Sequence, residues 1–123
     1  MTPDAGADSV FEIVARDALP NDGNTYEFEG LRYGETGVSF IWVDMAPGGG
    51  VRLHKHPYQE IFIIHEGVAT FTVGAAAEVE ARAGQIVIAP AGTPHKFRNS
   101  GEQRLRQVDI HVSSQFVTEW LEE

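Results

Sequence analysis

The sequence predicts an all-β fold, a sandwich or barrel built from short strands. Apolar and β-branched runs of about four to eight residues recur along the chain, and turn-forming residues separate them every ~8 to 12 positions. At 123 residues the chain can bury a substantial core in one domain but has no room for a second functional module. We therefore expect residues 9–123 to form a single domain. Residues 1–8 are small, polar and acidic, and we expect them to be disordered.

Strand signals begin directly after that terminus. Residues Val10–Ala15 predict a first short strand, and Leu19–Asn24 predict a loop with dense turn chemistry. The segments YEF and LRY flank Glu29-Gly30 and predict a hairpin-like pair. Val38–Met45 predict a longer strand that ends at Pro47 and a run of three glycines.

The second half of the chain continues the same pattern. EIFII and VATFTV predict two strands that pair across Glu66-Gly67. The segment AAAEVEAR has helical propensity, but it lies between turns, so we expect a loop and a short strand there. QIVIA predicts a strand before a Pro/Gly turn, and residues 104–112 predict a last strand.

The C-terminus carries the one helix that the sequence predicts. Phe116 and Trp120 are four residues apart, as are Val117 and Leu121, so one apolar stripe could close over the barrel after a serine cap. Two terminal glutamates oppose the helix dipole there, so the last turn should fray.

Two histidines in the centre of the chain have the spacing of a metal site. Side chains two apart in a strand lie on one face, about 6.5 to 7 Å apart, so His54 and His56 can point toward one ion. Pro57 interrupts the strand, and a tight hairpin through it would bring Glu60, at the start of the next strand, beside the histidines.

A third histidine, His95, follows a turn that contains two prolines and a glycine. Any one of these histidines alone would be read as a surface or turn residue, and Glu60 alone as a solvated strand opener. Their joint spacing favours metal ligation. Three imidazoles and a carboxylate, in a chain without cysteine, suit a divalent Fe, Mn, Ni, Co, Zn or Cu ion.

Ten positions in this region resemble the two sequence motifs of the cupin superfamily, with no substitution. In the first motif the residues between successive conserved positions number five, one, three and six, and in the second they number five, one, two and three. The positions are Gly48, His54, His56, Glu60 and Gly67, then Gly84, Pro90, Gly92, His95 and Asn99. The resemblance implies a jelly-roll barrel, or double-stranded β-helix, with one metal held by His54, His56, Glu60 and His95.

The resemblance leaves the reaction open, because cupins include dioxygenases, isomerases, epimerases, decarboxylases, lyases and proteins that only bind. An octahedral ion would keep two sites for substrate or dioxygen, which favours Fe, Mn or Ni as the functional metal. A closed tetrahedral zinc site would be structural, although zinc could be present in the isolated protein. A barrel that keeps the motifs but holds no metal is the remaining alternative.

Three residues are candidates for catalysis. Glu60 could leave the metal and act as a general base. His111 has the parity of Asp109 and Gln107 on the last strand and could face the pocket, although a structural histidine is the commoner outcome. Arg52 has the parity of the two central histidines and could hold an anionic substrate group, or could be an exposed residue at the rim. His65 should face outward.

Composition limits the partners. The chain has 18 acidic and 9 basic residues, a net charge of −9, and no basic cluster, which argues against nucleic acid and anionic membranes. Without cysteine, disulfides and thiolate chemistry are excluded. No signal peptide or membrane span is evident, so we expect a cytoplasmic protein.

In EIFII, Ile61 and Ile63 oppose the pocket face, so N-terminal strands or a second subunit must cover them, and we expect a homodimer.

Three functions remain compatible with the sequence. The first is a metal-dependent oxygenase acting on a small enolisable or phenolic molecule, which apolar pocket walls would suit. The second is a metal-dependent isomerase, epimerase or lyase of a small sugar, keto acid or lactone, with Glu60 or His111 moving protons. The third is a non-catalytic binder of a metal or small ligand. We favour the oxygenase.

Overall fold

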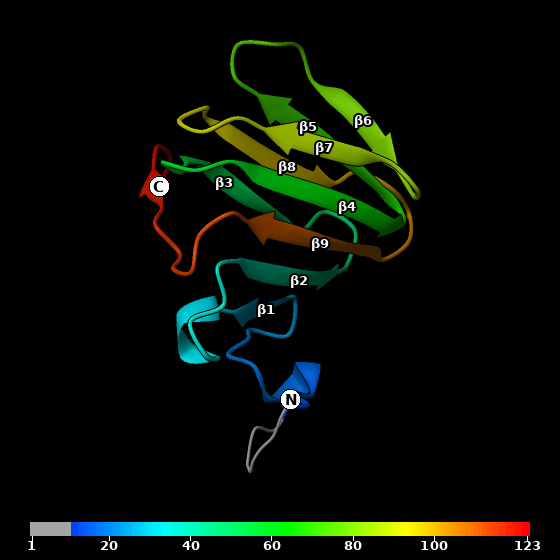
Figure 1. The fold of residues 1–123 in the computed structure, drawn as a ribbon. Helices are drawn as coiled ribbons and strands as arrows, with labels where there is room; N and C mark the ends of the chain where they lie inside the picture. The colour runs from blue at the N-terminus through cyan, green and yellow to red at the C-terminus, as the bar shows by residue number, and fades with distance from the viewer. Residues whose placement is uncertain (1–10) are drawn as a thin grey trace.

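The computed structural model describes residues 11–123, which form two five-stranded antiparallel sheets packed face to face (Figure 1). One sheet has the strand order β1-β2-β9-β4-β7 and the other β10-β3-β8-β5-β6. This jelly-roll arrangement confirms the predicted all-β fold class. The strands are β1 (Thr25–Phe28), β2 (Ser39–Met45), β3 (Gly50–Lys55), β4 (Glu60–Glu66), β5 (Val68–Val73), β6 (Val79–Arg82), β7 (Ile86–Ala89), β8 (His95–Asn99), β9 (Leu105–His111) and β10 (Glu119–Trp120); two 3-10 helices, η1 (Arg16–Ala18) and η2 (Gly30–Arg32), complete the elements.

The core lies between the sheets, where alternate side chains of each strand meet. In β9 every second residue is buried, beginning at Leu105 and ending at His111. Phe62 on β4 and Phe71 on β5 come from opposite sheets and pack edge to face, with their ring centroids 5.0 Å apart. Apolar residues fill one end of this interior, and polar residues that share the same inward parity gather at the other.

The chain changes sheet between β3 and β4. Sequence spacing predicts a tight hairpin at this point, but β3 pairs with β8 and β10, while β4 pairs with β7 and β9. The hairpin prediction is therefore wrong. The expected pairing of EIFII with VATFTV is wrong as well, because β4 and β5 lie in different sheets. Residues 57–59 carry the chain from one sheet to the other, so His56 and Glu60 approach each other across the sandwich.

The N-terminal predictions also need correction. Residues 11–15 of the predicted strand Val10–Ala15 form no strand, and Val10 lies outside the described residues, as does the predicted disordered segment, residues 1–8. The expected hairpin of YEF with LRY is absent, because LRY begins within η2 and β1 pairs with β2 instead. Pairing with β2 allows Tyr26 to lie opposite Trp42 in the sheet.

The C-terminal helix is also absent. The tail is extended, and its β10 segment adds to the edge of β3, with Leu121 N–H donating to Leu53 O at 2.9 Å. A helix of about two or three turns is only marginally stable by itself. Here the barrel offers the tail hydrogen-bond partners, including the Glu29 carboxylate for Phe116 N–H at 3.1 Å, and these replace the helical bonds.

The outer face of the first sheet remains apolar and open to solvent. A strand that is apolar on both faces is normally covered on both. Ile63 is 40% exposed and Ile86 is 61% exposed, so the described residues leave the outer face of β4 uncovered. None of the helices in residues 11–123 has the length and hydrophobicity that crossing a lipid bilayer would require.

Candidate metal centre

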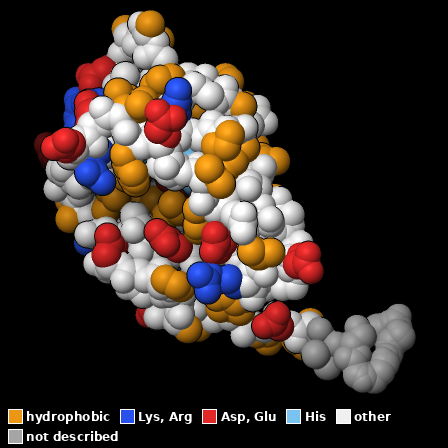
Figure 2. Space-filling view, turned by 90° about the vertical axis from the view of Figure 1, so that its left-hand side faces the viewer, with side chains coloured by type: hydrophobic (Ala, Val, Ile, Leu, Met, Phe, Trp, Pro, Cys, Tyr) orange, Lys and Arg blue, Asp and Glu red, His pale blue; other side chains and the backbone are white. Residues whose placement is uncertain are grey.

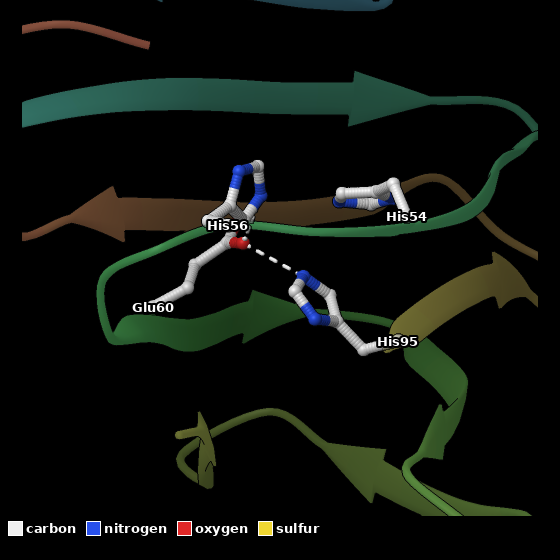
Figure 3. Close-up of side chains that lie close together, drawn as sticks. All are labelled: His54, His56, Glu60 and His95. Atoms are coloured by element: carbon white, nitrogen blue, oxygen red, sulfur yellow. Dashed lines mark hydrogen bonds and ion pairs between the residues drawn. The ribbon is translucent and has the colours of Figure 1, made fainter. Parts of the chain in front are cut away.

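Four predicted ligands meet at one end of the sandwich (Figure 3). His54 lies on β3, His56 just after its end, Glu60 begins β4 and His95 begins β8. All four are buried, and one nitrogen or oxygen atom from each lies within 4.8 Å of the others. Because β3 and β8 belong to one sheet and β4 to the other, the centre joins the two sheets.

Two local features bring the histidines together. His54 lies directly opposite His95 in the β3–β8 register, beyond an irregularity between Val51 and His54. The turn before His95 is attached to the chain at His56, since Gly92 N–H donates to His56 O at 2.7 Å. Gly92 has a positive φ of 77°, a conformation that other residues rarely adopt.

Hydrogen bonds to backbone carbonyls fix the tautomer of each of these histidines. The Nδ1 atoms of His54, His56 and His95 lie 2.6, 2.8 and 2.8 Å from the carbonyl oxygens of Arg52, Val117 and Thr93. A carbonyl can only accept, so each Nδ1 carries a proton. In a neutral imidazole the lone pair is then on Nε2, which is the atom each histidine can offer to a metal.

Two of these Nε2 atoms, those of His95 and His56, lie close to one carboxylate oxygen. Glu60 Oε1 lies 2.9 Å from His95 Nε2 and 3.0 Å from His56 Nε2, and the latter nitrogen is buried without a hydrogen-bond partner. Lone pairs and a carboxylate oxygen at this separation repel unless a positive charge lies among them. Either a proton on Nε2 or a divalent cation would supply it, and the set of three nitrogens and one oxygen suits a transition-metal ion.

Electrostatics keep the donor set in its metal-binding form. Burial raises the pKa of Glu60, but contacts with His111, His56 and His95 outweigh it and hold the pKa well below its ordinary value. Burial lowers the pKa of His54 to about 4. At neutral pH the carboxylate is therefore ionised and His54 is neutral, as coordination requires.

His111 faces the same carboxylate with the opposite tautomer. Its Nε2 lies 3.2 Å from Glu60 Oε2, and its Nδ1 lies 2.6 Å from the hydroxyl of Tyr58. Tyr58 accepts a hydrogen bond from Val117 N–H at 3.2 Å, and burial raises its pKa to about 12. The phenol keeps its hydrogen and donates it to Nδ1, so the proton of His111 is on Nε2, facing Glu60.

Arg52 lies away from this centre. It is exposed, and its guanidinium lies 4.6 Å from the centroid of the Trp120 ring. The irregularity in β3 separates it from the inward face that simple alternation predicts. His65, predicted to face outward, is exposed.

A cavity of about 450 Å³ opens onto the centre. Three of the predicted ligands line it, together with His111, Asp109 and apolar side chains from both sheets. The C-terminal tail forms part of the wall through Phe116, Thr118 and Trp120. A small organic molecule of drug-like size or less would fit beside the metal position.

Comparison with known families agrees with the geometry. The model of the cupin domain matches residues 41–111, more than half of the chain. The chain belongs to the cupin family. Among proteins of curated function, none matches this sequence.

Solved cupin structures resemble the chain in fold. An oxalate decarboxylase of Bacillus subtilis, described with Mn(II) centres, is 21% identical, with a TM-score of 0.76 over 85% of this chain and 30% of its own. An oxalate decarboxylase of Lactobacillus farciminis, in complex with formate, is 20% identical, with a TM-score of 0.71 over 83% of this chain and 32% of its own. This cupin spans about a third of their length, and at this identity the likeness concerns the fold.

Several residues at the centre have no signal in the cupin motifs. Tyr58 lies in the segment predicted as a turn, Asp109 lies between two apolar residues of β9, and Val117 acts through its backbone. The inward parity of Asp109 with His111 was visible in the sequence. Nothing in the sequence shows that the tail crosses the cavity, because that depends on its pairing with β3.

Metal binding should depend on the buried histidines. We expect wild-type protein to take up about one Fe(II), Mn(II), Ni(II) or Zn(II) ion per chain and a His54→Ala, His95→Ala variant to take up less than a tenth as much, because two of four ligands are lost. Elemental analysis after gel filtration measures this. The exposed His65→Ala variant is the matched control. Equal uptake by the double variant would contradict the assignment.

Lowering the pH should reduce the free energy of unfolding of the metal-free protein, because His54 becomes protonated more readily in the unfolded state. Its folded pKa of about 4 lies below the ordinary 6.5, so the stabilisation is present above pH 6.5 and is lost as pH falls toward 4. Between pH 7.5 and 4.5 the loss is about 2 kcal/mol. Burial raises the pKa of Asp109, which acts in the opposite sense, so the quantity to measure is the difference from a His54→Gln variant.

Urea denaturation in the presence of a chelator gives the free energy of unfolding for both proteins. We expect the wild-type advantage over the variant to shrink by about 2 kcal/mol across that range. A difference that stays constant with pH would show that His54 does not titrate in this way.

Proposed function

We propose that this cupin is a mononuclear metal-dependent enzyme acting on a small organic molecule. The observation that carries the proposal is the set of three histidines whose Nδ1 atoms are held by carbonyls, with Nε2 directed toward an ionised glutamate. The adjoining cavity supports a substrate beside the ion. The Mn(II) centres of the Bacillus subtilis relative, a protein of the same fold, are consistent with this function.

An oxygenase reaction is the best-supported chemistry. Apolar side chains such as Phe62, Phe97 and Met45 line the cavity, so a phenolic or enolisable molecule with an apolar body would be held there. A bound Fe(II), Mn(II) or Ni(II) ion would supply redox and Lewis-acid chemistry. The chain itself would orient the substrate, exclude water and accept its acidic proton through Glu60.

The contact between His111 and Tyr58 favours a second candidate, an isomerase, epimerase or lyase. Tyr58 is hydrogen-bonded to His111, and His111 Nε2 lies 3.2 Å from Glu60 Oε2 without a hydrogen bond, so a small shift of the imidazole would complete a route for a proton between Tyr58 and Glu60. Such a path serves proton transfer at a carbon beside a carbonyl, with no need for dioxygen. Arg52, the third predicted catalytic residue, would contribute only from the rim.

Dioxygen separates the two reactions. We expect Fe(II)-loaded protein to consume dioxygen with members of a panel of phenols, diketones and keto acids, and to be inactive anaerobically. A Tyr58→Phe variant should lose about tenfold or more in kcat, because His111 loses the partner that fixes its proton. The control is His65→Ala, which should keep full activity.

An oxygen electrode and product analysis by mass spectrometry measure these outcomes. Turnover under anaerobic conditions would favour the isomerase or lyase. Melting shifts with metal and ligands but no product from either panel would favour a protein that only binds.

We also propose that the chain forms a homodimer through the outer face of the first sheet. Two rows of apolar side chains cross neighbouring strands there in register. The rows are Trp42, Val108, Ile63 and Ile86, and Phe40, Ile110, Ile61 and Ile88. A patch of this kind on a sheet is typical of an interface, and a second copy would cover Ile61 and Ile63.

Light scattering after gel filtration tests the dimer. We expect a mass of about 27 kDa, twice the 13.5 kDa of one chain, for the wild type and a monomer for Ile63→Lys, since a charge in the patch would have to be desolvated. Val79→Lys is the control, because Val79 is also exposed, at 55%, but lies on the other sheet. A dimeric Ile63→Lys protein would place the interface elsewhere.

A further inference from the structure

The cavity beside the metal centre is lined by acidic groups and histidines but by no lysine or arginine of the described residues. Among the described residues that line it are Asp22, Glu27, Glu60 and Asp109, and none is a lysine or arginine. Residues 1–10 contain no lysine or arginine in their sequence. Figure 2 shows a hollowed face of the molecule with hydrophobic side chains in the hollow, acidic side chains along its lower edge, and Lys or Arg side chains farther out beside them.

Basic residues near this end of the barrel are engaged elsewhere. The Arg52 guanidinium lies over the Trp120 ring, 4.6 Å from its centroid, and Arg52 is exposed and is not among the residues that line the cavity. Lys55 lies 3.9 Å from Glu119. A divalent ion held with one carboxylate leaves a single net positive charge at the centre. A ligand with two negative charges would therefore have one of them buried without a counterion, which is strongly unfavourable.

Asp109 stands out within the apolar part of the cavity. It lies between Ile41 on β2 and Phe62 on β4 in the sheet register, and all three line the cavity. Its side chain is 3% exposed. Gln107 Nε2 donates to its Oδ1 at 2.7 Å and is its one hydrogen-bond partner among residues 11–123.

The environment of Asp109 favours the neutral form of its carboxyl. Burial raises its pKa well above the ordinary value, and the nearby charge of Glu60 raises it further, while the bond from Gln107 opposes both. A protonated carboxyl has one O–H donor. With Gln107 bonded to Oδ1, the O–H is available for an oxygen atom of a bound molecule.

We propose that the cavity selects an uncharged molecule with an apolar body and a carbonyl or hydroxyl oxygen that accepts a hydrogen bond from Asp109, and that it rejects small dicarboxylates. Asp109 is a specificity-determining residue in this scheme. The inference rests on the proposed function, because it names the substrate class of the same site. The proposed substrate class excludes oxalate, although the two structural relatives are named as oxalate decarboxylases.

The protein has a built-in reporter for binding. It contains two tryptophans, of which Trp120 lines the cavity and Trp42 lies on the outer sheet face. A Trp42→Phe variant therefore reports on the cavity through Trp120 alone. Loading with Zn(II), which has no redox chemistry, allows binding to be measured without turnover.

Fluorescence titration of that protein with cyclohexanone and phenol, and with oxalate and malonate, tests the substrate class. We expect the two uncharged probes to bind at least tenfold more tightly than the two dicarboxylates. Equal or tighter binding of oxalate would overturn the proposal. The same ranking is expected in metal-free protein, so a failure of Zn(II) uptake would contradict the proposed function while leaving the cavity's preference measurable.

Two substitutions on the Trp42→Phe background test the role of Asp109. Asp109→Val removes the donor and should weaken binding of both uncharged probes by about tenfold, the usual effect of losing one buried hydrogen bond. Asp109→Asn keeps a donor in the same shape and should stay within about threefold of the parent protein. Unchanged binding by Asp109→Val would overturn the role of Asp109.

Zn(II) content and melting temperature are measured for each variant, so a loss of metal or fold is distinguished from a loss of the hydrogen bond. If Asp109→Val does not fold, Asp109→Ser, which has a shorter side chain and a different reach, takes its place. Weakened binding with Zn(II) content intact supports the proposal.

Discussion

The ionised carboxylate of Glu60, buried between two β-sheets, is the constraint on which the rest of this structure depends. An isolated charge in such a place would be strongly unfavourable. Here His95, His56 and His111 approach it from both sheets at 2.9 to 3.2 Å. The arrangement is favourable only when positive charge lies among these groups. The metal centre is therefore also a contact that joins the two halves of the sandwich.

The C-terminal tail takes part in this centre although it contributes no ligand. Val117 uses its carbonyl to fix His56 and its N–H to fix Tyr58, which in turn fixes His111. One residue of extended backbone thus sets the tautomers of two histidines in opposite senses. In the predicted helix the C=O of Val117 would have accepted an intrahelical bond and its N–H would have faced the serine cap. The extended conformation leaves them available for the centre.

The surroundings of the metal position carry more information about the substrate than the fold does. Cupins share the barrel and the donor set across many reactions. In this chain the cavity combines acidic and apolar lining residues, and the neutral form of Asp109 is favoured in an apolar row. The route from Tyr58 through His111 to Glu60, completed by a small shift of the imidazole, would carry a proton. These features distinguish between small neutral molecules and dicarboxylates, which the four ligands alone do not.

The sequence by itself determined the fold class and the four candidate ligands, because turn residues and ligand spacing act locally. Gly92 illustrates this, since its positive φ is set within its own turn. The crossing between sheets, the exposure of Arg52, the extended tail and the roles of Tyr58 and Asp109 were decided by the tertiary structure. Each depends on pairing between distant segments, such as β10 with β3. Local propensity cannot predict such pairing, because it does not include hydrogen bonds to strands that are distant in the sequence.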